Sequence, residues 1–271
     1  MKKVAVICSV YKGDLIEYIK PAMKSVLNQD YKFCELFIFV DGDIDSDVLL
    51  YLNELEVKKY VTIIYNKENV GLAQGLNTLI DYIIEKGSHD YIARMDSDDL
   101  SRENRISEQV NFLETNHDID VVGTYCKEFG SSYSLDVKKL PLVHEELRSF
   151  SVVRCPFVHP TVMFRATVFN NNIRYPINTL MTEDMALWLD LLSKGFRFAN
   201  IPQVLLDYRL SESTIGRRIS FGKAKSELLI RLKYMVQSKQ VSFKNLILVF
   251  LRIPFHCAPE FVLKYLYKYH R

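Results

Sequence analysis

Three acidic side chains follow a short apolar segment in the first half of the chain. Residues 91–95 read Tyr-Ile-Ala-Arg-Met, and Asp96, Asp98 and Asp99 come directly after them. Carboxylates this close together repel one another, so a cation is the simplest way to maintain the cluster. Oxygen ligands of this kind suit Mg²⁺ or Mn²⁺, usually held by one or two carboxylates and substrate phosphates. The alternative is a solvated acidic turn, which is common in loops.

The apolar segment predicts a buried strand that delivers these carboxylates to its carboxyl end, where ligands bind in open α/β sheets. Ser9 and Tyr11 follow a first predicted strand, and Asp41 follows a second. We expect them at the same sheet edge. An aromatic ring that stacks on a base, with a carboxylate that accepts from an imide N–H, would recognise uracil. The alternative is a core tyrosine and an Asp-Gly turn.

Strand-like and helix-like segments alternate along the chain, which predicts an α/β fold with a mainly parallel sheet. The predicted strands are residues 3–10, 35–40, 60–65, 91–95, 120–124, 197–201 and 204–209. Helical periodicity covers residues 16–26, 72–83, 106–113 (with Ser101 as its cap) and 182–194. Residues 125–180 are less periodic and predict loops and irregular strands.

The distribution of charge is uneven, although the net charge of the 271 residues is only +2. From Arg217 onward there are twelve Lys and Arg and two acids, a balance of +10, so residues 1–216 carry −8. An acidic front and a basic, aromatic rear indicate two surfaces with different partners.

The basic rear predicts a helix over residues 220–237 and a second apolar segment over 243–255, interrupted by Lys244 and Arg252. A membrane-spanning helix needs about 20 apolar residues, so this segment does not span. Its mixture of aromatic and basic residues is typical of an interfacial helix on an anionic leaflet. The alternative is a C-terminal helix packed on the domain, with its basic face in solvent.

Several other site classes have no support in the sequence. The five cysteines are scattered without a Cys-x-x-Cys pair, which predicts neither zinc nor disulfides and fits a reducing cytoplasm. The first apolar run is too short for a signal peptide and lacks a cleavage site. No glycine-rich phosphate loop of the dinucleotide or Walker type occurs. A cation on the acidic cluster would instead neutralise a leaving diphosphate.

Further segments complete a recognisable series. They are Asn69-Val-Gly71-Leu-Ala-Gln-Gly-Leu-Asn77, Arg102 and Arg105 before a helix, His159-Pro-Thr-Val-Met-Phe-Arg165, Thr182-Glu183-Asp184-Met-Ala-Leu-Trp188 and Tyr208-Arg209. With the motifs above, their order and spacing over roughly residues 3–215 resemble family 2 glycosyltransferases of the GT-A fold. The resemblance is strongest to the bacterial enzymes that build O-antigen and exopolysaccharide repeat units.

The resemblance implies a GT-A domain over residues 1–215, with a nucleotide-sugar half (1–124) and an acceptor half (125–215). A helical extension over 216–271 follows. It also implies roles for the nucleotide half. Uridine would be held by Ser9, Tyr11 and Asp41, and the ribose and phosphate would be approached by Asn69 and Gly71. The Asp-x-Asp pair would be Asp96 and Asp98, with Asp99 as a third candidate metal ligand.

In the acceptor half, Asp184 matches the general base of the family. An inverting transfer needs a carboxylate that takes the proton of the acceptor hydroxyl opposite the leaving diphosphate. The alternative is helix N-terminal charge, since Thr182-Glu183-Asp184 begins a helix. His159 and Glu183 are further candidates for the acceptor site.

Two positions depart from the family pattern. Lys12 stands where many relatives have Asn, and residues 210–213 contain no His where relatives often carry one. A contact with the diphosphate would then come from Arg209, Arg217 or Arg218.

The sequence therefore predicts an inverting, metal-dependent transfer of glucose or galactose from a UDP-sugar to a lipid-diphosphate-linked saccharide. The protein would be cytoplasmic, peripheral on the inner face of the cell membrane, and without a nucleic-acid partner. One alternative is nucleotidyl transfer, for which residues 10–14 are a poor phosphate loop. The other is a non-catalytic carbohydrate- or membrane-binding module. The joint presence of four candidate site carboxylates argues against it; they are Asp41, Asp96, Asp98 and Asp184.

Overall fold

The computed structural model describes residues 1–212, 221–259 and 262–265. Its centre is an eight-stranded sheet with the order β3-β2-β1-β4-β7-β6-β8-β5. The strands are β1 Val4–Tyr11, β2 Cys34–Asp41, β3 Val61–Asn66, β4 Tyr91–Arg94, β5 Leu100–Ser101, β6 Val121–Phe129, β7 Met163–Arg165 and β8 Phe198–Arg209. The pairs β1–β2, β2–β3, β1–β4 and β6–β8 are parallel, and β4–β7, β6–β7 and β5–β8 are antiparallel. The α/β class is confirmed, with a mixed sheet.

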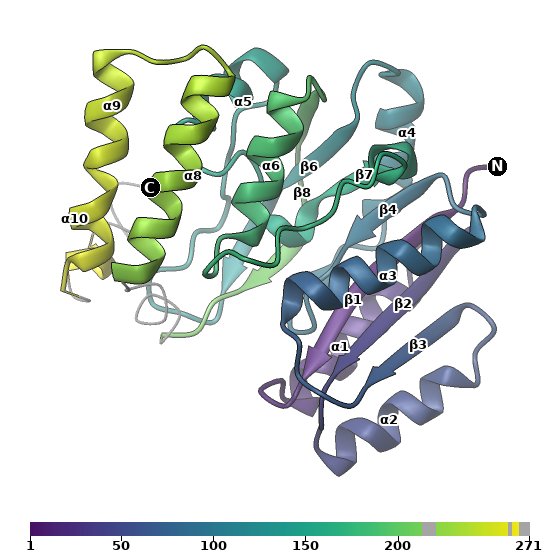
Figure 1. Ribbon diagram of the computed structural model, residues 1–271. Coiled ribbons are helices and arrows are strands. Elements are labelled where there is room, and N and C mark those ends of the chain that lie inside the picture. The colour runs from purple at the N-terminus through teal and green to yellow at the C-terminus, as the bar shows by residue number, and fades with distance from the viewer. Residues whose placement is uncertain (213–220, 260–261, 266–271) are drawn as a thin grey trace.

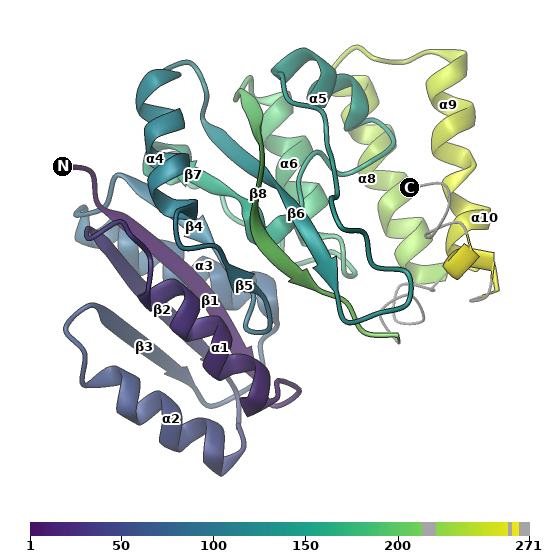
Figure 2. The ribbon, with the colours of Figure 1, turned by 180° about the vertical axis from the view of Figure 1, so that it is seen from behind.

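Helices cover both faces of this sheet (Figures 1 and 2). They are α1 Ile16–Leu27, α2 Ser46–Glu56, α3 Leu72–Lys86, α4 Arg105–Thr115, α5 His144–Phe150, α6 Glu183–Ser193, α8 Phe221–Gln237, α9 Phe243–Phe250 and α10 Arg252–Cys257. Two single turns, η1 His159–Thr161 and η2 Ala166–Phe169, lie between α5 and α6.

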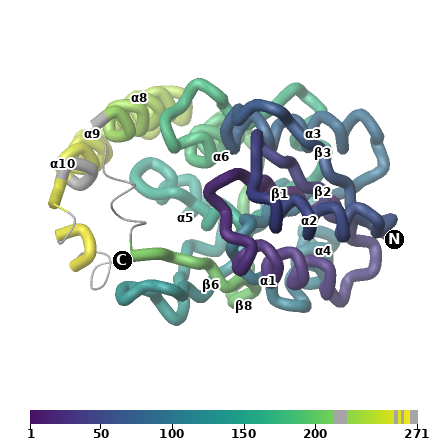
Figure 3. Tube along the Cα trace, turned by 90° about the horizontal axis from the view of Figure 1, so that it is seen from below, coloured from purple at the N-terminus to yellow at the C-terminus, as the bar shows by residue number. Residues whose placement is uncertain are grey.

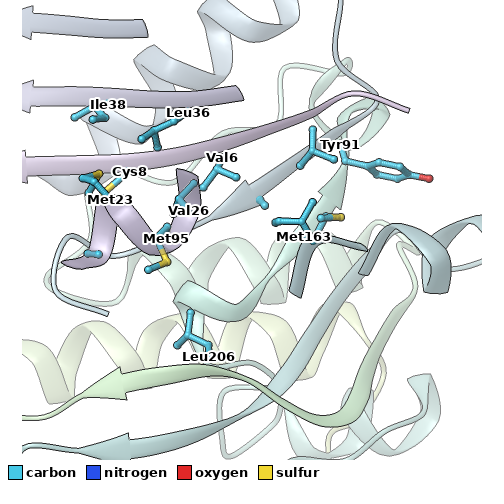
Figure 4. Packing of buried hydrophobic residues seen from close by; sticks show 14 of the residues in the cluster. Val6, Cys8, Met23, Val26, Leu36, Ile38, Tyr91, Met95, Met163 and Leu206 are labelled. Atoms are coloured by element: carbon cyan, nitrogen blue, oxygen red, sulfur yellow. The ribbon is translucent and has the colours of Figure 1, made fainter. Parts of the chain in front are cut away.

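The core consists of two layers that meet at the sheet. One cluster joins the sheet to α1, α2 and α4, and Figure 4 shows part of it around Val6, Cys8 and Met95. The other joins it to α3, α6 and α8. Along β1, Val4, Val6, Cys8 and Val10 belong to the first cluster, and the intervening Ala5 and Ile7 to the second. This alternation, buried on both faces, holds the carboxyl ends of β1, β2 and β4 in fixed positions.

Local predictions differ from the structure at three places. The two short strands predicted over 197–201 and 204–209 are one strand, β8, whose register with β6 shifts around Pro202 and Gln203. Proline cannot donate to the ladder, so an irregularity there is expected. Ser101 is not a helix cap, because it pairs with Leu206 in β5 and α4 begins only at Arg105. Helices α2 and α5 were not predicted.

Helices α8, α9 and α10 stand beside α6, at the end of the molecule opposite α2 and β3 (Figures 1 and 3). Helix α8 is joined to the sheet domain by Thr182 and Ser226, whose hydroxyl oxygens lie 3.2 Å apart. The Arg231 guanidinium also donates to the carbonyls of Ser151 and Val152. The predicted domain boundary after residue 215 lies outside the described residues. None of the helices described here has both the length and the apolarity needed to cross a membrane.

Candidate active site

The carboxyl ends of β1 and β2 meet as the sequence predicts. Tyr11 and Asp41 are register partners in the parallel β1–β2 pair, and Ser9 lies half-buried on the same strand end. Tyr11 is 44% exposed, and its ring lies over Gly13, where any Cβ would come within 2.4 Å of the ring. An exposed aromatic face is therefore available beside Asp41.

Asp41 holds the segment that leads into α3. Its Oδ1 accepts from the Val70 N–H at 2.7 Å, and its Oδ2 accepts from the Gly71 N–H at 2.9 Å. The Asn69 amide donates to the Asp41 carbonyl at 3.2 Å, and Gly71 has φ +86°, which favours glycine. Thus Asp41, Asn69 and Gly71 are brought together. Each Asp41 oxygen keeps a second lone pair, although the residue is only 3% exposed, and its contact with uracil stays a prediction.

The acidic cluster beyond β4 is larger than the sequence analysis predicted. Asp96 forms an ion pair with the buried Arg94. Burial and the negative charge of Asp96 raise the pKa of Asp98 to about 6. Burial also raises the pKa of Asp14 to about 6, with Asp96 adding to the effect. Asp14 was missed because it lies in the turn after β1, where its carboxylate accepts from the Tyr11 N–H at 3.1 Å.

Asp99 and Arg209 join the end of β4 to the end of β8. The fully buried Asp99 accepts from the backbone N–H of Arg209 at 2.7 Å, and Arg209 Nε donates to the Asp98 carbonyl at 2.9 Å. Burial, then the charges of Asp96 and Asp98, raise the pKa of Asp99 well above its usual range. The Arg209 guanidinium also lies 3.9 Å from the Tyr18 ring centroid. These contacts hold the turn that presents Asp98.

In the part of the chain that the structure describes, no three His, Cys, Asp or Glu side chains gather as a metal-binding set. Asp98 and Asp14 are nevertheless partly buried hard oxygen donors, and the negative charge of Asp96 contributes to the raised pKa of each. Mg²⁺ commonly uses one or two carboxylates and completes its coordination with water and phosphate oxygens. The residues present therefore fit a metal–diphosphate site. Arg217 and Arg218, also predicted for phosphate, lie outside the described residues.

Asp184 stands in the first turn of α6, where its Oδ1 accepts from the Met185 N–H at 2.6 Å. Burial and the charge of Asp184 raise the pKa of the neighbouring Glu183. A cavity of about 1160 Å³ joins this turn to the nucleotide end. Its lining includes Val70, Gly71, Asp96, His159, Glu183 and Asp184, and on the far side Lys223, Leu248, Leu251 and Arg252.

His159 forms part of the wall of this cavity rather than reaching across it. Its Nε2 lies 2.9 Å from the Tyr175 hydroxyl, and its ring packs against Trp188 with centroids 5.9 Å apart. Burial and the positive charge of Arg94 lower the pKa of His159 well below its usual range. The imidazole is therefore neutral at pH 7.

Arg94 is a second residue that the sequence analysis missed. It is 1% exposed, and its Nε and Nη1 have no hydrogen-bond partner among the described residues. Its charge acts on Asp14, Asp96 and Glu183, which belong to both ends of the site. The sequence signal for this residue is a cation inside the otherwise apolar run 91–95. Because such charges are rarely buried without a partner, it indicates an acidic partner nearby.

Two bacterial glycosyltransferases are similar in sequence to nearly the whole chain. Amylovoran biosynthesis glycosyltransferase AmsE of Erwinia amylovora is 28% identical over 266 residues, covering 97% of each chain. UDP-Gal:alpha-D-GlcNAc-diphosphoundecaprenol beta-1,3-galactosyltransferase of Escherichia coli is 28% identical over 273 residues, covering 98% of this chain and 95% of its own.

Solved structures share the GT-A fold. S. aureus TarS in complex with UDP-GlcNAc has a TM-score of 0.66 at 15% identity, covering 94% of this chain and 72% of its own. Mannosyltransferase PcManGT from Pyrobaculum calidifontis, in complex with GDP-Man and Mn²⁺, has a TM-score of 0.63 at 15% identity, covering 94% and 70%. The sequence profile described as glycosyl transferase family 2 matches residues 5–171. The chain belongs to glycosyl transferase family 2.

Proposed function

We propose that this glycosyltransferase moves a hexosyl residue, glucose or galactose, from a UDP-sugar to a lipid-diphosphate-linked saccharide, with inversion and with a divalent metal ion. The observation that carries the proposal is that Asp96 and Asp184 line the same cavity. Direct transfer requires that the donor diphosphate and the acceptor hydroxyl bind next to each other, and this cavity would hold both.

The nucleotide end would hold UDP through side chains at the carboxyl ends of the three strands β1, β2 and β4. Tyr11 would stack on the base beside Asp41, and the 69–71 segment held by Asp41 would approach the ribose and diphosphate. Asp98 and Asp96 would hold Mg²⁺ or Mn²⁺, with Asp99 fixing their turn. When bound, the metal supplies positive charge against the leaving diphosphate.

The base would be Asp184. Its carboxylate would take the proton of the acceptor hydroxyl while that oxygen attacks the anomeric carbon from the side opposite the diphosphate. UDP would leave with the electron pair of the broken bond, so the sugar configuration would invert. Helix α6 fixes the backbone of Asp184, and its Oδ1 is already oriented by the Met185 N–H.

The acceptor class is supported by the relatives and by the far side of the cavity. The E. coli relative is named for a GlcNAc-diphosphoundecaprenol acceptor, and AmsE for amylovoran biosynthesis. At the far side, apolar Leu248 and Leu251 line the cavity together with the cations Lys223 and Arg252, of which Arg252 also pairs with Glu227. A lipid-linked diphosphate combines an apolar chain with anionic charge. A role at the cytoplasmic face of the membrane, in surface polysaccharide synthesis, follows from this acceptor.

Product analysis tests the proposal. Purified protein is incubated with UDP-glucose or UDP-galactose, Mn²⁺ and a synthetic lipid-diphosphate GlcNAc acceptor, with an EDTA-treated control. We expect metal-dependent release of UDP and an anomeric configuration, measured by NMR, opposite to that of the donor. Release of pyrophosphate would instead indicate nucleotidyl transfer. Binding without turnover of either donor would indicate a non-catalytic module or another sugar.

A further inference from the structure

Helix α9 carries an apolar face that no other described element covers. Its members are Phe243 at 80% exposed, Ile247 at 45%, Phe250 at 50% and, directly after the helix, Leu251 at 59%. They recur at i, i+4, i+7 and i+8, which places them on one side of the helix. Figures 1 and 3 show α9 at the outer edge of the molecule with α8 on its inner side. We call these four residues the α9 face.

The opposite side of α9 is the one that packs on the protein. Val249 is fully buried, and Leu246 packs against the second core cluster. The helix is also capped at its start, because the Ser242 hydroxyl accepts from the Asn245 N–H at 3.1 Å. The outward direction of the α9 face is therefore fixed by folding. Contiguous exposed apolar patches of this kind mark interaction surfaces.

The surroundings of the α9 face are basic. Residues 228–259 contain five Lys and Arg and no Asp or Glu, but Arg231 and Arg252 pair with Glu227, so the unbalanced positive charge comes from the three lysines. Lys233, Lys239 and Lys244 are exposed on α8 and around the start of α9. Apolar residues surrounded by lysines are typical of a helix that lies in the interface of an anionic bilayer. A second copy of the same face would bring like charges together, which disfavours a symmetric dimer.

The α9 face also continues into the catalytic cavity. Leu251 belongs to the face and, at the same time, lines the cavity that contains Asp184. Leu248, one turn earlier, lines the cavity as well. An apolar path therefore leads from the outer surface of α9 to the acceptor side of the site.

We infer that the α9 face inserts into an anionic bilayer and that the lipid chain of the acceptor passes into the cavity beside Leu251. The passage of the acceptor rests on the proposed function, whereas the bilayer contact depends only on α9. Insertion of one amphipathic face combines buried apolar area with attraction of the lysines to anionic lipid, so both terms contribute to binding.

Sedimentation of the full chain with vesicles tests the inference. The vesicles contain phosphatidylglycerol and phosphatidylethanolamine, or phosphatidylcholine alone. The test variant is Phe243→Glu with Ile247→Glu, and the matched control is Leu50→Glu with Val57→Glu, whose apolar side chains are 65% and 84% exposed at α2. We expect wild type and control to sediment with anionic vesicles, and the test variant to bind at least tenfold less with an unchanged circular dichroism spectrum. Equal sedimentation of test variant and control would overturn the inference, as would dimerisation through this face without vesicle binding.

Transfer assays separate this inference from the proposed function. A water-soluble acceptor with a short alkyl diphosphate should be glycosylated equally by wild type, test variant and control. An acceptor embedded in anionic vesicles should be glycosylated at least tenfold more slowly by the test variant alone. No transfer to either acceptor by wild type would contradict the proposed function, while leaving vesicle binding as a separate result. Equal rates on the embedded acceptor would contradict the passage beside Leu251.

Discussion

The carboxylate of Asp41, at the end of β2, accepts a hydrogen bond from the backbone N–H of Gly71 at 2.9 Å. The second carboxylate oxygen accepts from Val70, so one side chain fixes the start of α3. Gly71 and Val70 line the cavity that also contains Asp96 and Asp184. Asp41 therefore shapes the nucleotide end through the backbone, whatever it contacts in the bound nucleotide.

Replacing Asp41 tests this relationship. Asp41→Ala leaves two backbone N–H groups without their acceptor, and we expect the free energy of unfolding to fall by about 1–3 kcal/mol. UDP affinity should fall as well, because the 69–71 segment loses its anchor. Asp41→Asn keeps one side-chain acceptor and should lie between Ala and wild type.

Denaturant unfolding and calorimetric titration with UDP measure the two effects. The control is Asp43→Ala, which removes a nearby exposed carboxylate. If Asp41→Ala unfolds and binds UDP like this control, the positioning role of Asp41 is wrong.

The position of the site could be predicted because it depends on sheet geometry. The carboxyl ends of parallel strands share one edge, so Tyr11 and Asp41 had to lie together once β1 and β2 were recognised. The acidic residues after β4 follow from the same rule. These are local signals, in which a short apolar run ends in a polar group.

The remaining parts depend on packing between distant segments. Arg94 is a charged residue in a buried strand. Only the folded structure shows the ion pair with Asp96 that allows this charge to be buried. The sequence predicts two short strands in place of β8 because Pro202 interrupts the strand-like run of apolar residues. In the structure, β8 continues through Pro202 as one strand paired with β6. The tail was predicted as an extension, yet Lys223 and Leu248 of that region line the cavity. Sequence periodicity carries no information on such contacts.

The metal ligands can be distinguished by paired substitutions in the acidic turn. Asp98→Ala should abolish the increase in UDP affinity that Mn²⁺ produces, because Asp98 is the half-buried carboxylate among like charges. Asp99→Asn should retain that increase, since an Asn oxygen can still accept from the Arg209 N–H.

Calorimetric titration with UDP, with and without Mn²⁺, measures this difference. The reverse pattern, with metal dependence lost in Asp99→Asn and kept in Asp98→Ala, would identify Asp99 as the ligand and contradict the assignment.

The burial of His159 should appear in the pH dependence of stability. Its pKa in the folded protein is lowered from 6.5 by burial and by Arg94. Between pH 6.5 and the lower pKa of the folded protein, the unfolded chain binds a proton at His159 and the folded chain does not. The free energy of unfolding therefore falls as the pH falls. The loss amounts to up to about 1.4 kcal/mol for each pH unit below 6.5. His159→Gln removes this loss while keeping a polar partner for Tyr175.

Urea unfolding at several pH values between neutral and mildly acidic measures the effect. We expect the stability advantage of wild type over His159→Gln to shrink as pH falls. His117→Gln, which replaces an exposed histidine, serves as the control. A constant difference between His159→Gln and wild type would mean that His159 titrates alike in both states.

The most direct test of the account is the rate of sugar transfer by Asp184→Asn, measured together with its affinity for UDP and Mn²⁺. The control is Asp190→Asn on the same helix, whose carboxylate pairs with Lys194 at the surface. We predict that Asp184→Asn transfers sugar at least about 100-fold more slowly, the usual contribution of a general base, while its UDP affinity matches that of the control. Transfer by Asp184→Asn at the wild-type rate would contradict the assignment of the base.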